Sequence, residues 1–176
     1  GNVGYIGINP SLAVVLKTFA GERVRIFQDS SMVSESVPSS SLRGTSQNMW
    51  VDYDGSANLL SVYLNQSGDA KPASPILTHT VDLATLLGSQ AYVGFSAATG
   101  GSTDNHDIEE WDFSASTGGV TADLDSSLQF NGRAFKGLRL TPPSIFVGGS
   151  AFLDQIIAVD SDTSCSTQFQ FKIHGG

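Results

Sequence analysis

The sequence has little of what disulfide-rich, metal-cluster, nucleic-acid-binding and membrane proteins need. Its single cysteine, Cys165, excludes an internal disulfide and a cysteine metal cluster, and we interpret it as a small buried apolar residue. Nine basic against seventeen acidic residues leave a net charge of −8, which repels polyphosphate and predicts no nucleic-acid partner. Apolar runs such as residues 12–16 are far shorter than the ~20 residues of a membrane span, so no membrane contact is expected.

What is present is typical of an all-β, extracellular or secreted domain. Small polar residues separate many short apolar segments, and 176 residues are enough for one buried core. Phe169, Phe171 and Ile173 alternate with polar residues, which predicts a strand with one buried face. Strands are expected at 12–19, 23–28, 47–53, 59–64, 76–81, 91–97, 108–113, 127–130, 137–140, 151–152, 156–159 and 167–173. A helical turn is expected at 82–87, whereas residues 30–46 and 114–126 read as loops.

One hairpin is marked by its turn residues. An Asp54-Gly55 turn joins the strand at 47–53 to the strand at 59–64. Asp52 and Asp54 flank Tyr53 and could be read as a catalytic acid pair. Turn chemistry explains them at least as well.

Two longer stretches resemble legume-type (L-type) lectin domains. MWVDYDGSANLLSVYLNQSG and ILTHTVDLATLLGSQAYVGFSAATGGSTDNHDIEEWDF, within residues 47–113, match the C-terminal half of such domains, and GYIGINPSLAV at 4–14 matches the segment before it. SLQFNGRAFKGLRLTPPSIFVGGSAFLDQIIAV and STQFQFKI, within 127–173, resemble the N-terminal half. The resemblance implies a concanavalin-like jelly-roll sandwich of two antiparallel sheets with sugar-binding loops.

The two halves stand in exchanged order, which implies a circular permutation. Residues 1–113 correspond to the C-terminal half, 127–176 to the N-terminal half, and 114–126 would bridge the former termini. Chain ends that lie close together on a sandwich make such a rearrangement tolerable. We therefore expect one shortened sandwich over 1–176.

The resemblance breaks down at the metal site. In the family, the strand matching residues 11–19 carries a Glu and an Asp, and the next loop adds Asn, Asp and His, which together hold calcium and a transition metal. Here Val15 and Lys17 occupy the first two positions, so no metal or other cofactor is expected. The Lys17 ammonium either replaces the cations and pairs with a nearby acid, or faces solvent.

The family strand that would follow residues 171–176 carries the central sugar-binding Asp, and it has no counterpart in this sequence. Its absence leaves two strands unpaired. Either the sheet closes around the gap, or a partner chain fills it. The second alternative predicts a homo-oligomer formed through the open sheet edge.

The remaining candidate site is the loop before the strand at 108–113. The family's corresponding loop contacts sugar through amides and small polar side chains, which assigns carbohydrate binding to Gly101, Ser102, Thr103, Asp104 and Asn105. Asn2, in the segment matching a second sugar-facing loop, completes the set. An ordinary exposed hairpin loop remains the alternative. Binding is expected to be weak.

New metal or catalytic chemistry finds little support. Asp104, His106, Asp107, Glu109 and Glu110 resemble a metal cluster, but strict strand alternation would scatter the acids over both faces. Trp111 and Phe113, between the acids, are expected in the core.

No Gly-x-Ser-x-Gly elbow or activated nucleophile occurs, so an enzyme is not expected. The leading hypothesis is a metal-independent lectin-like module that binds glycans. The alternative is a structural or protein-interaction sandwich, engineered or truncated, without sugar binding. A degenerate glycosidase ranks third.

Overall fold

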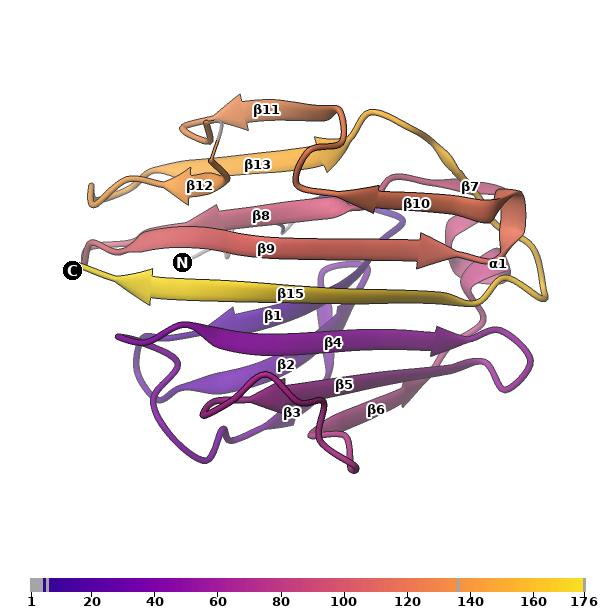
Figure 1. Cartoon of the computed structure of the whole chain (residues 1–176), viewed down its shortest axis with the longest axis horizontal. Coiled ribbons are helices and arrows are strands. Elements are labelled where there is room, and N and C mark those ends of the chain that lie inside the picture. The colour runs from indigo at the N-terminus through magenta and orange to yellow at the C-terminus, as the bar shows by residue number, and fades with distance from the viewer. Residues whose placement is uncertain (1–4, 6, 136, 176) are drawn as a thin grey trace.

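The computed structural model describes residues 5, 7–135 and 137–175, which form strands with little helix (Figure 1). In chain order the strands are β1 (Leu12–Lys17), β2 (Arg23–Gln28), β3 (Ser31–Ser36), β4 (Gln47–Asp54), β5 (Leu59–Asn65), β6 (Leu77–Thr80), β7 (Gln90–Ala91), β8 (Gly94–Ala98), β9 (Asn105–Ala115), β10 (Val120–Asp123), β11 (Leu128–Gly132), β12 (Arg139–Thr141), β13 (Gly148–Leu153), β14 (Ile157–Ala158) and β15 (Cys165–His174). The helices are α1 (Leu83–Leu87) and the single 3-10 turn η1 (Thr117–Gly119). Within the described ranges, no helix is long and apolar enough to cross a membrane.

The largest sheet joins strands from both ends of the chain. Its order over the described residues is β10-β9-β15-β4-β5-β6, with β12 added beside β9. β15 therefore lies between two strands of the first 115 residues, as Figure 1 shows. Phe169 pairs with Met49 on one side and with Trp111 on the other. Because β15 pairs with both β4 and β9, the C-terminal part of the chain and the first 115 residues share one sheet and one core.

The second layer consists of smaller sheets. β1, β2 and β3 lie behind the large sheet in Figure 1, and β11, β13 and β8 lie along its β9–β10 side. Val24 and Ile26 of β2 are fully buried against Met49 and Val62 of the large sheet in one apolar cluster. The all-β sandwich of antiparallel sheets expected from the sequence is confirmed.

β1 and β8 each form the outer strand of a small sheet. Within the described part of the chain, β1 pairs only with β2 and β8 only with β13. Phe169 faces the core from the middle of the large sheet but is only half-buried, although its neighbours Met49 and Trp111 are 0% and 3% exposed. Its ring packs edge-on against Phe95 of β8, with ring centres 5.2 Å apart. The core is thus incompletely covered above Phe169.

A β-bulge in β9 overturns the expected alternation. The pairing with β15 skips from Gln170–Glu110 to Phe171–Ile108, so Glu109 is an extra residue. Ile108 and Trp111, three residues apart, consequently both point into the core. The expectation that acids alternate between both faces is wrong, because Glu109, Glu110 and Asp112 are all exposed on the outer face.

Two segments expected as loops contain strands. β3 pairs with β2 inside the serine-rich segment 30–46. Residues 114–126 contain β10, which forms a tight hairpin with the end of β9 and buries Val120 and Ala122. The expected helical turn is confirmed as α1, capped by the Asp82 carboxylate, which accepts a hydrogen bond from the Thr85 amide.

The Asp54-Gly55 hairpin is confirmed between β4 and β5. The Asp54 carboxylate accepts hydrogen bonds from the Ser56 hydroxyl and from the Ala57 and Ser56 amides, which together lower its pKa. Asp52 lies instead on the outer face of β4, where it contacts Lys71 and Ser166. Turn chemistry therefore accounts for Asp54 but not for Asp52.

Candidate functional site

The loop at 99–104 joins β8 to β9 and is anchored to a second loop at 142–147. The Thr99 hydroxyl donates to the Ser144 carbonyl at 2.6 Å, and the Thr99 amide donates to the Val147 carbonyl at 2.9 Å. The Phe146 amide donates to the Gly100 carbonyl at 3.0 Å. These bonds hold the base of the loop, and its tip projects into solvent.

The structure separates the five candidate sugar-binding residues of this loop into two groups. Gly101 and Ser102 are exposed and Thr103 is half-buried. Asp104 and Asn105 are each 7% exposed, and the buried Asn105 Oδ1 has no hydrogen-bond partner among the described residues. The Arg43 guanidinium lies 2.5 Å from the Asp104 carboxylate, and the Asn105 amide nitrogen donates to the His174 carbonyl. Asn2 lies outside the described residues.

An exposed apolar pair stands next to the loop tip. Ile145 and Phe146 are 51% and 76% exposed, and Phe146 has a φ of 53°, in the left-handed region. The bond from its amide to Gly100 fixes this conformation beside the glycines. The sequence reading missed this pair, although two large apolar residues between prolines and glycines were a visible signal for an exposed loop.

The acids that follow the loop are held by basic groups of the protein itself. Asp107 accepts two hydrogen bonds from the Arg139 guanidinium, at 2.6 and 2.7 Å, and one from His174 at 2.9 Å. Burial acts to raise the pKa of Asp107, but these hydrogen bonds outweigh it and lower the pKa. Asp107 therefore serves as a structural counter-ion.

His106 is also structural. Its Nδ1 lies 2.5 Å from the hydroxyl of Thr141, which is fully buried and also donates to the Asp104 carbonyl. Burial lowers the pKa of His106, and the nearby acids Asp104 and Asp107 offset this only in part. A fully buried hydroxyl cannot attack a substrate, so the pair lacks the geometry of an activated nucleophile.

The β1–β2 hairpin carries Val15 and Lys17, the two residues that the sequence resemblance assigns to the family's metal-ligand positions. Val15 is 8% exposed and packs in a small cluster with Tyr5 and Phe27. The Lys17 ammonium donates hydrogen bonds to the carbonyls of Ala20 and Gly21, at 2.9 and 3.0 Å. Among the described residues no acid pairs with Lys17; the ammonium lies at the surface and contacts backbone carbonyls of its own turn.

The segment at 41–43 connects this hairpin to the 99–104 loop. The Glu22 carboxylate accepts hydrogen bonds from the Ser41 hydroxyl and the Leu42 amide, at 3.0 and 2.9 Å. The next residue, Arg43, holds Asp104. Three segments distant in sequence are thereby joined at one end of the sandwich, the end at which β8 and β15 finish in Figure 1.

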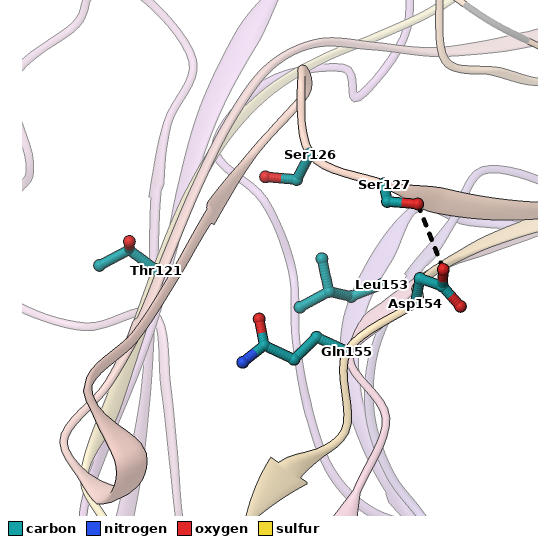
Figure 2. Close-up of a pocket in the computed structure, with 6 residues that line it drawn as sticks. All are labelled: Thr121, Ser126, Ser127, Leu153, Asp154 and Gln155. Carbon is teal, nitrogen blue, oxygen red and sulfur yellow. Dashed lines mark hydrogen bonds between the residues drawn. The ribbon is translucent and has the colours of Figure 1, made fainter.

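A shallow pocket lies elsewhere on the surface (Figure 2). It is lined by Thr121, Ser126, Ser127, Leu153, Asp154 and Gln155. The Ser127 hydroxyl donates to the Asp154 carboxylate at 3.3 Å. None of these residues belongs to the 99–104 loop or to the β1–β2 hairpin, so the pocket is separate from the candidate site.

The comparison with known families assigns the chain. The family model described as legume lectin domain matches residues 21–129. The chain belongs to the legume lectin domain family. A legume lectin domain has a carbohydrate-binding fold, and the L-type resemblance expected from the sequence is confirmed.

The similar relatives are much longer plant proteins. Over 73 residues the chain is 44% identical to L-type lectin-domain containing receptor kinase VIII.2 of Arabidopsis thaliana, covering 42% of this chain and 10% of the relative. Over 77 residues it is 40% identical to the probable L-type lectin-domain containing receptor kinase S.7 of the same plant, covering 42% and 11%. Receptor kinase SIT1 of Oryza sativa subsp. japonica is 35% identical over 65 residues, covering 37% and 10%. The matched part of this lectin domain thus spans about a tenth of these relatives.

Proposed function

We propose that this legume lectin domain is a non-catalytic, metal-independent module that binds glycans weakly through the tip of its 99–104 loop. The observation that carries the proposal is the anchored loop itself. Gly101, Ser102 and Thr103 follow Gly100, whose carbonyl accepts a hydrogen bond from the amide of the exposed Phe146. A small polar surface next to an aromatic face suits a sugar, which offers both hydroxyl groups and apolar ring faces.

Weak binding is expected because the polar side chains at the base of the loop already contact other parts of the protein. The Asp104 carboxylate accepts from Arg43, and the Asn105 amide donates to His174. The Asp104 carboxylate cannot bind a sugar hydroxyl without losing Arg43, and the Asn105 Oδ1, which has no hydrogen-bond partner among the described residues, is buried out of reach of a ligand. Glycan contact is left to the loop tip and to Phe146, a small surface that the loop's anchoring keeps ordered.

Independence from metal is supported by the donor atoms at the two family positions. A divalent cation of the calcium type needs six to eight oxygen ligands. Val15 offers none, and the Lys17 ammonium carries a positive charge of its own. Because that ammonium binds two carbonyls of the turn, it orders the hairpin as a bound cation would. The residues present do not fit the family's metal pair.

The exchanged order of the halves is supported by the position of β15. It pairs over most of its length with both β4 and β9. One circularly permuted domain, bridged by the β9–β10 hairpin, accounts for this arrangement. We place the module outside the cell, since its relatives are named receptor kinases.

Glycan-array binding with and without a chelator tests the proposal. We expect weak binding that EDTA leaves unchanged and that Phe146→Ala reduces. Tyr92→Ala is the matched control, because this exposed aromatic residue precedes β8 whereas Phe146 packs at its far end. Binding that EDTA abolishes, or that Tyr92→Ala and Phe146→Ala reduce equally, contradicts the proposal.

The alternative function is that of a scaffold assembled through its open edges. Within the described part of the chain, β1 and β8 are outer strands, and Phe169, which packs on Phe95 of β8, is only half-buried; both features favour it. Sedimentation velocity over a wide concentration range separates the two. A homo-oligomer that binds no glycan supports the scaffold, and a monomer that binds glycan supports the lectin module.

A further inference from the structure

The face of β1 and β2 that points away from the core carries a row of basic side chains. Val14 and Leu16 of β1 pack on the core, so Val15 and Lys17 point outward. In the antiparallel pairing, Lys17 lies directly opposite Arg23, and Val15 lies opposite Arg25. Lys17, Arg23 and Arg25, which we call the basic row, therefore occupy one face at the turn end of the hairpin.

Nearby acids neutralise the basic row only in part. Glu35 of β3 lies 3.0 Å from Arg25 and 4.0 Å from Arg23. Glu22, which precedes Arg23, directs its carboxylate to Ser41 and Leu42 instead. Three cations against one carboxylate leave a local surplus of positive charge on a chain whose net charge is −8.

Two cations of the basic row face each other across the hairpin. Like charges directly opposite each other on neighbouring strands repel, and Lys17 and Arg23 stand in that relation. Their side chains are nonetheless held in place. Arg23 donates to the Glu22 carbonyl at 2.7 Å, and Lys17 donates to the turn carbonyls. A carboxylate or sulfate group placed between them would relieve the repulsion and accept charge-assisted hydrogen bonds from the remaining donors.

The basic row is joined to the candidate sugar site. Glu22 ties the hairpin to the 41–43 segment, and Arg43 of that segment holds Asp104 at the base of the 99–104 loop. A glycan that contacts the loop tip can therefore extend toward the basic row at the same end of the sandwich.

We propose that the basic row of Lys17, Arg23 and Arg25 binds the acidic group of a carboxylated or sulfated saccharide. The inference rests on the proposed function and narrows it to acidic glycans. Lys17 and the neighbouring arginines thus supply positive charge to the ligand directly, without a bound metal ion. The two sources of the anion, uronate and sulfate, share this chemistry.

Titration with three oligosaccharides of equal length tests the inference: a neutral galactan, an oligogalacturonate and a sulfated galactan. We expect the acidic ligands to bind at least roughly tenfold more tightly than the neutral one at low salt, with a preference that shrinks as salt rises. Comparing the two acidic ligands shows which group the row prefers.

Arg23→Gln is the decisive variant, and Arg133→Gln is its control. Both substitutions remove one positive charge, but Arg133 is exposed after β11 and belongs to none of the three segments joined at the site. We expect Arg23→Gln to weaken acidic-glycan binding by about tenfold while neutral-glycan binding and the melting temperature stay unchanged. Arg133→Gln should change neither affinity.

The outcomes separate this inference from the proposed function. Equal affinity for neutral and acidic ligands, or equal effects of the two substitutions, would contradict anion binding by the basic row but not the proposed glycan-binding function. Failure of all three ligands to bind overturns both.

Discussion

Arg43 and Asp104 are 61 residues apart in the chain, yet their charged groups lie 2.5 Å from each other. The Asp104 side chain is only 9% exposed and the Arg43 side chain is 40% exposed. This pair fixes the base of the loop that carries the proposed sugar contacts. The Arg43 guanidinium therefore helps to hold the base of the loop in place.

Breaking this pair should loosen the loop and destabilise the fold. Arg43→Gln leaves the Asp104 carboxylate buried without its partner, which we expect to cost about 1–3 kcal/mol of unfolding free energy. Urea denaturation measures the loss. Arg133→Gln, at an exposed position, should change the unfolding free energy by less than about 0.5 kcal/mol. Equal losses in both variants would show that Arg43 contributes only its charge.

Stability should decline as the pH falls below the ordinary pKa of histidine. The pKa of His106 is lowered in the folded state, mainly by burial, so the unfolded chain takes up a proton first. The stabilisation is present above about pH 6.5 and is lost as the pH falls toward the folded-state pKa. Urea midpoints measured from pH 7.5 to 5 should fall in the wild type.

His106→Gln should flatten that dependence, because it removes the titrating group. His79→Gln is the matched control, since His79 forms a hydrogen bond with Gln28 on another part of the surface. The control should keep the wild-type slope. A His106→Gln variant with an unchanged slope between pH 7.5 and 5 would assign the dependence to other groups.

Cys165 should react slowly with thiol reagents in the folded protein. Burial raises the pKa of its thiol to about 11, and Asp52 adds to the effect. At pH 8 the reactive thiolate is then a very small fraction of the population. Ellman's reagent should label the native chain at least tenfold more slowly than the chain in guanidinium chloride. Rapid native labelling would contradict this protonation state.

The Lys17 ammonium should make added metal irrelevant to stability. EDTA and millimolar calcium are both expected to leave the melting temperature of the wild type unchanged. Lys17→Met removes two charge-assisted hydrogen bonds to the turn carbonyls, and we expect a loss of about 1–2 kcal/mol, measured by urea denaturation. A calcium-dependent rise in the melting temperature of the wild type would overturn the metal argument.

Local patterns predicted much of the architecture. Alternation at Phe169, Phe171 and Ile173 predicted the inward face of β15, and the Asp54-Gly55 turn predicted the β4–β5 hairpin. Both depend on residues close together in the chain. The polar strands β3 and β10 were missed because β3 shows no clear apolar alternation and β10 is only four residues long.

The candidate site was only half predictable. The residues of the 99–104 loop were found from the family motif that contains them. Arg43 and Phe146 were missed, because each reaches the loop from a distant segment and neither belongs to a local motif. The bulge at Glu109 likewise depends on pairing with β15, and it exposes Glu109 on the same outer face as Glu110 and Asp112.

The amino-acid sequence by itself determined most of the segments that become strands and the family to which the chain belongs. Only the tertiary structure determined the partners of the charged groups. The Lys17 ammonium donates to the carbonyls of Ala20 and Gly21, and the Arg43 guanidinium donates to the Asp104 carboxylate. Backbone propensity and alternation act over a few residues, whereas an ammonium or guanidinium finds its partner only after sheets from distant segments have packed together.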